Sequence, residues 1–89
     1  MAKTILITGA TAGFGKATAE LFASHGWKLI LSGRRRERLV SLQKKLSQNQ
    51  VHIANFDVSI LSEVDNFIAS VPEEFKTIDV LVNNALLGP

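Results

Sequence analysis

The sequence lacks cysteine and tyrosine, has only two histidines, and contains no long uninterrupted apolar stretch. Without cysteine, a disulfide scaffold and a thiolate metal site are excluded. The two histidines lie far apart in the chain, so we expect no metal centre. No apolar run approaches the roughly 20 residues that are needed to cross a bilayer, and the first residues show no signal-peptide pattern. We therefore expect a cytoplasmic protein with no membrane contact.

An excess of charge of one sign is also lacking. Ten Lys and Arg residues against eight Asp and Glu residues give a net charge of +2, which is weak evidence for a nucleic-acid surface. Positive charge is concentrated at Arg34, Arg35, Arg36 and Arg38, but no stacking aromatic residues accompany this cluster. We therefore expect no nucleic-acid partner. A chain of 89 residues is long enough for one small domain.

Four short apolar runs alternate with amphipathic segments along the chain. The apolar runs, which we expect to be strands, cover residues 4–8, 27–31, 51–56 and 78–82. The amphipathic segments, which we expect to be helices, cover residues 14–24, 37–46 and 59–71. Connections of this length between strands imply a parallel sheet with right-handed crossovers. The pattern predicts an α/β fold of the Rossmann type, a doubly wound parallel sheet in the order βαβαβαβ.

Local signals predict where the helices end and which residues face the core. Gly26 predicts the end of the first helix, Ser59 the N-cap of the third, and Pro72 the end of the third. The residues expected on the core-facing sides are Phe14, Ala17, Leu21 and Phe22, then Leu39, Leu42 and Leu46, then Leu61, Val64, Phe67, Ile68 and Val71.

A glycine-rich segment, TGATAGFG at residues 8–15, joins the first strand to the first helix. Glycines at such a junction permit a sharp turn and a close approach of the backbone to a pyrophosphate, which then faces the positive end of the helix. A P-loop does not fit, because Ala10 and Ala17 stand where it needs a glycine and a hydroxyl. The G-x-G-x-x-G form fails at Thr18. The spacing that fits is T-G-x-x-x-G-x-G.

This spacing resembles the cofactor loop of the short-chain dehydrogenase/reductase family, with Thr8, Gly9, Gly13 and Gly15 on its fixed positions. Two further segments are similar to the family's pattern, Asp57-Val58 after the third strand and Asn83-Asn84-Ala85 after the fourth. In the family, the Asp-Val pair meets the adenine, and the Asn-Asn-Ala-Gly signature lies beside the cofactor and steadies the sheet. The resemblance implies that residues 1–89 form a nucleotide-binding half-domain, truncated before the family's later strands.

The end of the second strand favours NADP over NAD. An NAD-binding unit usually has an acidic residue there, about 20 residues after the loop, to hold the ribose 2′-hydroxyl. This chain has Ser32, Gly33, Arg34 and Arg35 instead, and guanidinium groups pair well with a 2′-phosphate. We interpret Lys16, Arg36 and Arg38 as solvated. The residues expected to bind NADP are Gly9, Thr11, Ala12, Gly13, Phe14, Gly15, Arg34, Arg35, Asp57, Val58, Asn83 and Ala85.

The family's catalytic pair, Tyr-x-x-x-Lys, has no counterpart here because the chain contains no tyrosine. Leu86 also stands where the family's signature has glycine. Two functions therefore remain open. One is an NADP-dependent oxidoreductase that transfers hydride between the cofactor and a small hydroxy or carbonyl substrate, with its catalytic half absent from this chain. The other is a non-catalytic NADP(H)-binding module.

The resemblance also bears on substrate and assembly. Phe14 and the stretch from Gly33 to Arg35 loosely resemble family members that act on small 3-hydroxy acids such as serine. Because members of the family are usually dimers or tetramers, we expect a homo-oligomer at full length.

Overall fold

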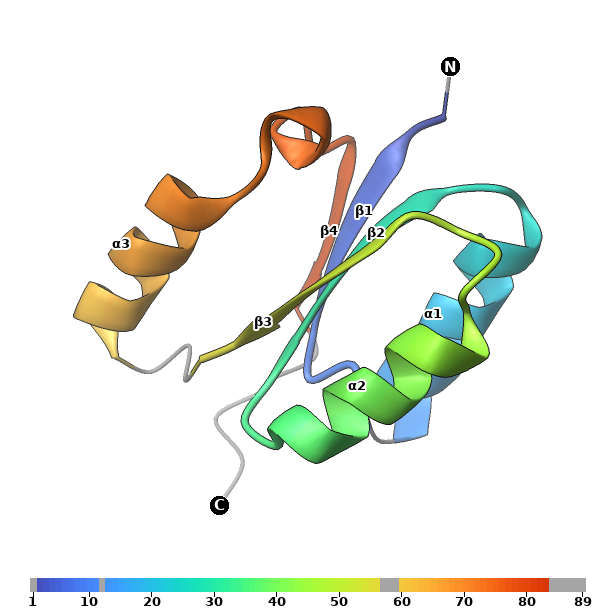
Figure 1. Cartoon of the computed structure of the whole chain (residues 1–89), viewed down its shortest axis with the longest axis horizontal. Helices are drawn as coiled ribbons and strands as arrows, with labels where there is room; N and C mark the ends of the chain where they lie inside the picture. Colours follow the sequence, from blue (N-terminus) through green and yellow to red (C-terminus); the bar gives the residue numbers. More distant parts are fainter. Residues whose placement is uncertain (1, 12, 57–59, 84–89) are drawn as a thin grey trace.

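A computed structural model describes residues 2–11, 13–56 and 60–83, which form one four-stranded parallel sheet and three α-helices (Figure 1). The elements in chain order are β1 (Thr4–Thr8), α1 (Gly13–Ser24), β2 (Lys28–Gly33), α2 (Arg36–Lys45), β3 (Val51–Asn55), α3 (Leu61–Ser70), the 3-10 turn η1 (Glu73–Phe75) and β4 (Val80–Asn83). The strands lie in the order β3-β2-β1-β4, and every neighbouring pair is parallel. The predicted βαβαβαβ order is confirmed, and η1 is an addition that the sequence pattern did not indicate.

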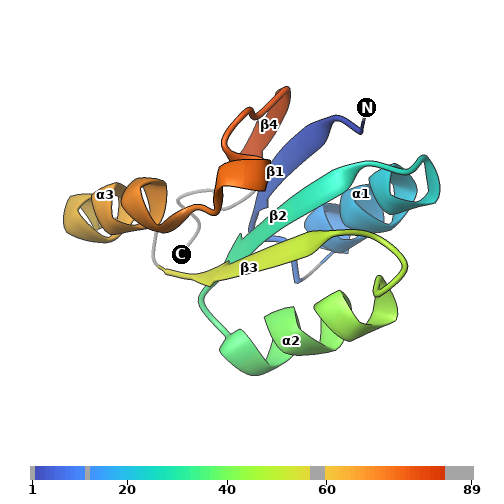
Figure 2. The same ribbon diagram turned by 45° about the horizontal axis from the view of Figure 1, so that its top comes forward.

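Helices cover both faces of the sheet, as the doubly wound prediction requires. Helices α1 and α2 lie on one face, and α3 lies on the other (Figures 1 and 2). Alternate residues of the central strands therefore enter two separate cores. All five residues of β1 are buried, which explains why its sequence is a nearly continuous apolar run.

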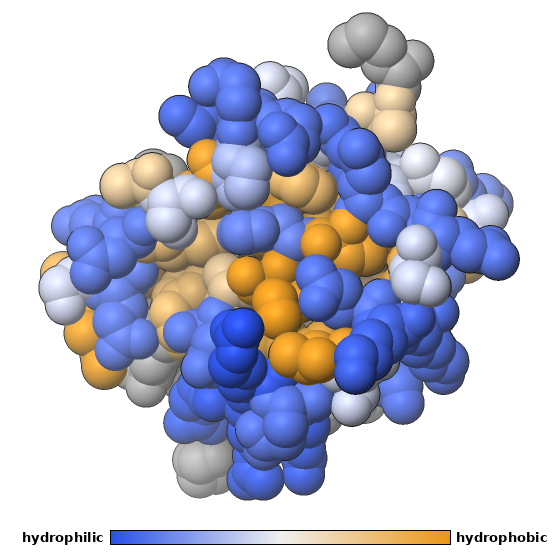
Figure 3. Space-filling model, viewed as in Figure 1, coloured by the Kyte–Doolittle hydropathy of each residue, from blue (hydrophilic) through white to orange (hydrophobic). Residues whose placement is uncertain are grey.

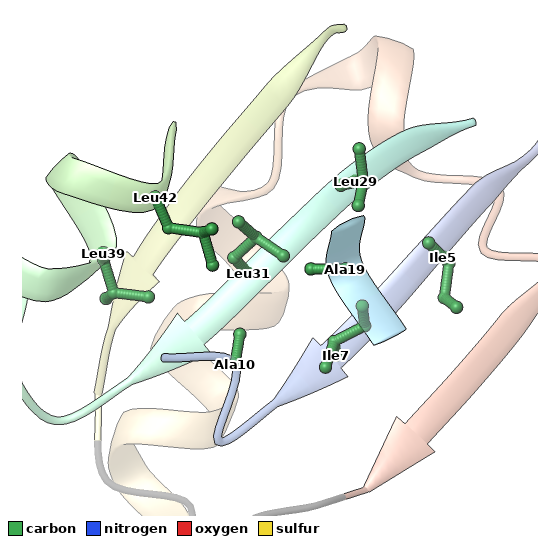
Figure 4. Close-up of a cluster of buried hydrophobic side chains, with 8 residues drawn as sticks. All are labelled: Ile5, Ile7, Ala10, Ala19, Leu29, Leu31, Leu39 and Leu42. Atoms are coloured by element: carbon green, nitrogen blue, oxygen red, sulfur yellow. The ribbon is translucent and has the colours of Figure 1, made fainter. Parts of the chain in front are cut away.

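The larger core lies between the sheet and the α1–α2 layer (Figure 4). Its buried members are Ile5, Ile7, Ala10, Ala19, Leu29, Leu31, Leu39 and Leu42. The smaller core, under α3 and η1, consists of Leu6, Ile30, Phe67, Val71 and Phe75. Removing this apolar surface from water stabilises the fold. The two cores therefore hold the strand ends in fixed relative positions.

The core-facing side of α1 agrees with the prediction only in part: Phe22 packs against the larger core, as predicted. Phe14 is 72% exposed and Leu21 is 57% exposed, whereas Gly15 and Ala19 are the buried residues of this helix. Small residues let α1 lie close against β1 and β2, and apolar spacing alone did not distinguish this stripe from the neighbouring one. In α2, Leu39 and Leu42 are buried as predicted.

The outer helix, α3, follows the prediction in part. Phe67 and Val71 are buried as predicted, but Leu61, the first residue of the helix, is 80% exposed. The N-cap of α3 is Ile60 rather than the predicted Ser59, and Ser59 lies outside the described residues. The helix ends before Pro72, as predicted.

The turn between α1 and β2 confirms the predicted helix stop. Gly26 has a φ of 80°, in the left-handed region that favours glycine. Its backbone N–H donates to the Ala23 carbonyl at 3.0 Å, and the Trp27 N–H donates to the Phe22 carbonyl at 3.2 Å. The side-chain amide of Asn49 reaches the same turn and donates to the carbonyls of Ala23 and Trp27 at 2.9 and 3.0 Å.

Strands β3 and β4 are the two edges of the sheet. Figure 3 looks onto the β3 side and shows apolar surface in the middle, bordered by hydrophilic residues. On β4, Leu81 is 61% exposed. Within the described ranges, none of the helices has both the length and the apolar character that a membrane span requires.

Candidate cofactor-binding site

The glycine loop follows β1 at the carboxyl edge of the sheet, meaning the side formed by the carboxyl ends of the four parallel strands. Ligands bind at this side in open α/β folds. Gly9 has a φ of 61° and Gly13 a φ of 51°, so both need the left-handed conformation that other residues adopt at a cost. A Cβ at Gly13 would meet no atom within 4 Å, which leaves open space beside the first turn of α1. Gly15 is buried in α1, facing the sheet. The loop therefore offers the turn, the room and the close helix packing that a pyrophosphate site needs.

The loop is also fastened to β2. The buried residue Ala10 donates its backbone N–H to the Ser32 carbonyl at 3.1 Å. A Cβ at Gly33 would lie 3.9 Å from Cγ2 of Thr11. The glycine loop and the end of β2, which lie about 20 residues apart in dinucleotide-binding sequences, are thus in direct contact in this chain.

Thr8 and Asn83 meet across the sheet, although 75 residues separate them. The Thr8 hydroxyl donates to the Asn83 side-chain oxygen at 2.7 Å, and the two residues are register partners on β1 and β4. This bond joins the carboxyl ends of two strands beside the loop. This geometry is compatible with the predicted sheet-steadying role of Asn83, which stays a prediction, and Asn83 is exposed.

Arg34 and Arg35 leave the end of β2 as exposed side chains. Arg35 is the N-cap of α2, with extended backbone and no side-chain cap bond. Among the described residues, neither guanidinium forms an ion pair. Both charges are therefore available to an anionic ligand at the place where the sequence predicted the 2′-phosphate.

Asn55 shapes this corner, although the sequence pattern did not indicate this role. Its side-chain amide donates to the Gly33 carbonyl at 3.0 Å and so ties the end of β3 to the segment that carries Arg34. The available signal was an asparagine at the carboxyl end of a predicted strand. Ser32 is a second unexpected feature, because its hydroxyl is buried and has no hydrogen-bond partner within the described ranges.

A hollow of about 390 Å³ opens between the first two helices, next to the loop. We call it the α1–α2 hollow. Its lining residues are Thr11, Lys16, Glu37, Arg38, Ser41, Leu42 and Lys45. Lys16 and Arg38 are exposed, which is compatible with their interpretation as solvated residues. Both also line the α1–α2 hollow, although they belong to different helices. The sequence could not predict this, because the residues lie on separate helices.

An ion pair connects the two helices beside this hollow. Lys45 donates to the Glu20 carboxylate at 2.6 Å. The hydrogen bond from Lys45 lowers the pKa of the exposed Glu20 carboxyl, and the more distant Lys16 contributes in the same direction. Lys45 is therefore already engaged, in contrast to the other two cations of the hollow.

The remaining predicted ligands lie outside the described residues. These are Ala12 in the loop, Asp57 and Val58 after β3, and Ala85 after β4. Leu86 also lies there. The described part of the site therefore covers the glycine loop and the end of β2, where the sequence predicts the pyrophosphate and the 2′-phosphate. The predicted contacts of all three groups, the adenine included, stay predictions. In the described part of the chain, no group of three metal-ligating side chains occurs.

Comparison with known proteins agrees with this geometry. A family model described as short chain dehydrogenase matches residues 3–88. Sulfoacetaldehyde reductase 2 of Chromohalobacter salexigens is 51% identical over 89 residues, covering 99% of this chain and 35% of that protein. An NADP-dependent 3-hydroxy acid dehydrogenase of Escherichia coli is 46% identical over 84 residues, covering 94% of this chain and 34% of that protein. A solved closed form of serine dehydrogenase with NADP+ has a TM-score of 0.87 at 43% identity, covering 91% of this chain and 32% of that chain.

The chain thus spans about a third of the length of the relatives that it matches. The match extends over nearly the whole chain and includes the glycine loop, the arginines after β2 and Asn83. It confirms the resemblance drawn from those motifs, including the similarity to 3-hydroxy acid dehydrogenases. This chain belongs to the short-chain dehydrogenase family.

Proposed function

We propose that this chain is the NADP(H)-binding part of an oxidoreductase that transfers hydride between NADP(H) and a small hydroxy or carbonyl compound. The observation that carries the proposal is the corner at the end of β2. There, Gly33 lies against Thr11 of the glycine loop, Arg34 follows immediately, and no carboxylate occupies the strand end. A 2′-phosphate there would therefore meet the positive charge of Arg34, and the strand end itself contributes no carboxylate.

The residues present fit a dinucleotide phosphate. Gly9 and Gly13 hold the loop in the left-handed conformation, and the space beside Gly13 leaves its backbone approachable. The N-terminus of α1 then presents unpaired backbone N–H groups and a positive dipole end to the pyrophosphate. NADP(H), when bound, supplies or accepts the hydride. This chain's part in the reaction is to bind and orient it.

Proton transfer would fall to residues outside these 89, because none of them is a tyrosine. The relatives named above support a small substrate, since their names specify sulfoacetaldehyde, 3-hydroxy acids and serine. We infer a 3-hydroxy acid or a similarly small hydroxy or carbonyl compound for the whole protein. We infer also that the whole protein is a homo-oligomer, as is usual in the family.

The absence of tyrosine favours one alternative, a module that binds NADP(H) without catalysis. A Tyr-x-x-x-Lys motif in any polypeptide that continues this sequence decides for the oxidoreductase. A polypeptide with no such motif that still binds NADPH decides for the module. Both alternatives assign the same function to the described residues.

Calorimetric titration with NADPH and with NADH tests the shared part of the proposal. We expect tighter binding of NADPH, and we expect Arg34→Ala to remove most of that preference. Hydrogen bonds to charged groups contribute about 1.5–3 kcal/mol, and the exposure of Arg34 reduces this to about 1 kcal/mol, or about fivefold in affinity. Arg36→Ala is the matched control, because Arg36 is also an exposed arginine and lies in α2, two residues beyond Arg34. Equal binding of both cofactors by the folded wild-type chain would contradict the proposal.

A further inference from the structure

The last two carbonyls of β2 are held from opposite sides of the strand, which lies between β1 and β3 (Figure 2). The Ser32 carbonyl accepts the Ala10 N–H of the glycine loop at 3.1 Å. The Gly33 carbonyl accepts a hydrogen from the side-chain amide of Asn55 on β3 at 3.0 Å. Successive carbonyls of an extended strand point in opposite directions, so the two bonds fix two different peptide planes.

Asn55 lies at the point where β2 and β3 stop pairing. Gly33 and Asn55 are the last register pair of the two strands, and each is the last residue of its strand. Two residues after Gly33, the backbone has reached Arg35, the N-cap of α2. The Asn55 side chain therefore attaches the final residue of β2 just before the chain turns into the helix.

Arg34 is the residue whose direction this bond determines. The Gly33–Arg34 peptide is trans, so the Gly33 carbonyl and the Arg34 N–H belong to one rigid plane. Gly33 has no side chain that would restrict its own backbone. The Arg34 side chain is exposed and forms no ion pair within the described ranges. The attachment of the Gly33 carbonyl is therefore what limits the directions in which Arg34 leaves the strand.

We propose that Asn55 is a positioning residue for the choice of cofactor: its bond to the Gly33 carbonyl directs the Arg34 guanidinium towards the 2′-phosphate and so increases the preference for NADPH over NADH. This role rests on the function proposed above. The amide of Asn55 is neutral and acts through Gly33, so it changes geometry and adds no charge. Without the bond, Arg34 samples more directions and loses more conformational entropy when it binds a phosphate.

A double-mutant cycle tests whether Asn55 acts through Arg34. Calorimetry on the 89-residue chain gives the ratio of NADPH affinity to NADH affinity for the wild type, Asn55→Ala, Arg34→Ala and the double variant. Asn55→Ala should lower this ratio about two- to threefold, as expected for one neutral hydrogen bond at an exposed position. In the Arg34→Ala background, the same substitution should leave the ratio unchanged, because the group that Asn55 directs is gone.

Asn49 provides the matched control near the amino ends of the same strands. Its side-chain amide also donates to backbone carbonyls, those of Ala23 and Trp27 at 2.9 and 3.0 Å. Asn49→Ala removes two such bonds at a less exposed position, so it should lower the melting temperature at least as much as Asn55→Ala. It should leave the affinity ratio unchanged. Asn55→Gln keeps an amide donor and should retain most of the ratio.

The backbone amide of Arg34 reports on the same bond without any cofactor. Its order parameter from ¹⁵N relaxation of the free chain should fall in Asn55→Ala and stay at the wild-type value in Asn49→Ala. An unchanged order parameter in Asn55→Ala would overturn the positioning role, whatever the cofactor affinities are.

The outcomes separate this role from the proposed function. If the wild type prefers NADPH and Asn55→Ala has the same ratio, the function stands and the positioning role fails. Equal losses of both cofactors, or effects of Asn55→Ala and Arg34→Ala that simply add, would make Asn55 a structural tie only. A folded wild-type chain with no preference contradicts the proposed function and, with it, the role of Asn55 in cofactor choice. In that case a lower order parameter in Asn55→Ala still shows that the bond fixes the Gly33–Arg34 peptide.

Discussion

Replacing Gly33 by aspartate puts a carboxylate at the end of β2, beside Thr11 of the glycine loop. A Cβ at this position would lie 3.6 Å from Cδ2 of Leu39 and 3.9 Å from Cγ2 of Thr11, which are ordinary van der Waals distances. The φ of Gly33 is not positive, so its backbone suits other residues. We therefore expect Gly33→Asp to fold and to melt close to the wild-type temperature.

The added charge should weaken NADPH binding and strengthen NADH binding. A carboxylate about 5 Å from a phosphate charge repels it by about 1 kcal/mol in water and about 3 kcal/mol at an effective dielectric constant of about 20. Since Gly33 is only half-buried, the lower part of this range applies, and a cost of about 1–2 kcal/mol corresponds to about 5- to 30-fold weaker NADPH binding. The same carboxylate can accept hydrogen bonds from the ribose of NADH, which adds about 0.5–1.5 kcal/mol.

Calorimetric titration of NADPH and NADH into the wild type, Gly33→Asp and Gly33→Asn measures both effects. Asparagine has nearly the size of aspartate without its charge, so Gly33→Asn should keep the preference for NADPH. A loss of the preference in both variants would point to crowding of the site. Undiminished NADPH binding by a folded Gly33→Asp variant would refute the placement of the 2′-phosphate at this corner.

Two further predictions concern backbone strain and pH. Gly13→Ala should lower the free energy of unfolding by about 1 kcal/mol because of its φ of 51° and should weaken binding of either cofactor; chemical denaturation and calorimetry measure the two effects, and an unchanged stability would contradict the strain. Burial lowers the pKa of His52, an effect that Glu74 partly offsets, so the unfolded chain takes up this proton first as the pH falls. The free energy of unfolding of the wild type should therefore decrease as the pH is lowered from about 6.5. The free energy of unfolding of His52→Gln should decrease less between pH 7 and pH 5.5. Chemical denaturation at a series of pH values measures both, and parallel pH curves for the two proteins would contradict this.

The fold could be predicted because each of its elements has a strong local signal. The four apolar runs match the four strands to within two residues at every end, a usual margin for such boundaries. Gly26 correctly predicted the end of α1, because the observed turn needs a residue with a left-handed backbone conformation. The glycine spacing identified the loop because positive φ angles at Gly9 and Gly13 leave little choice of residue.

Contacts between elements were not predictable in the same way. The bond from Asn55 to the Gly33 carbonyl depends on the register of β3 against β2, which no local pattern specifies. The convergence of Lys16 and Arg38 depends on how two helices lie side by side on the sheet. On α1, the buried stripe is made of small residues, Gly15 and Ala19, whose importance comes from close approach rather than from hydrophobicity.

The most direct test of the central claim is a map of where NADPH meets this chain, from ¹⁵N–¹H spectra recorded during a titration of the labelled protein. We predict changes in the amide chemical shifts of Gly9, Gly13 and Arg34, which lie at the carboxyl ends of the strands. The amide chemical shifts of Lys28 and Asp79, at the amino ends of the strands, should not change. Shifts confined to the opposite edge, or no shifts in a well-dispersed spectrum, would contradict the assignment of this chain as an NADP(H)-binding unit.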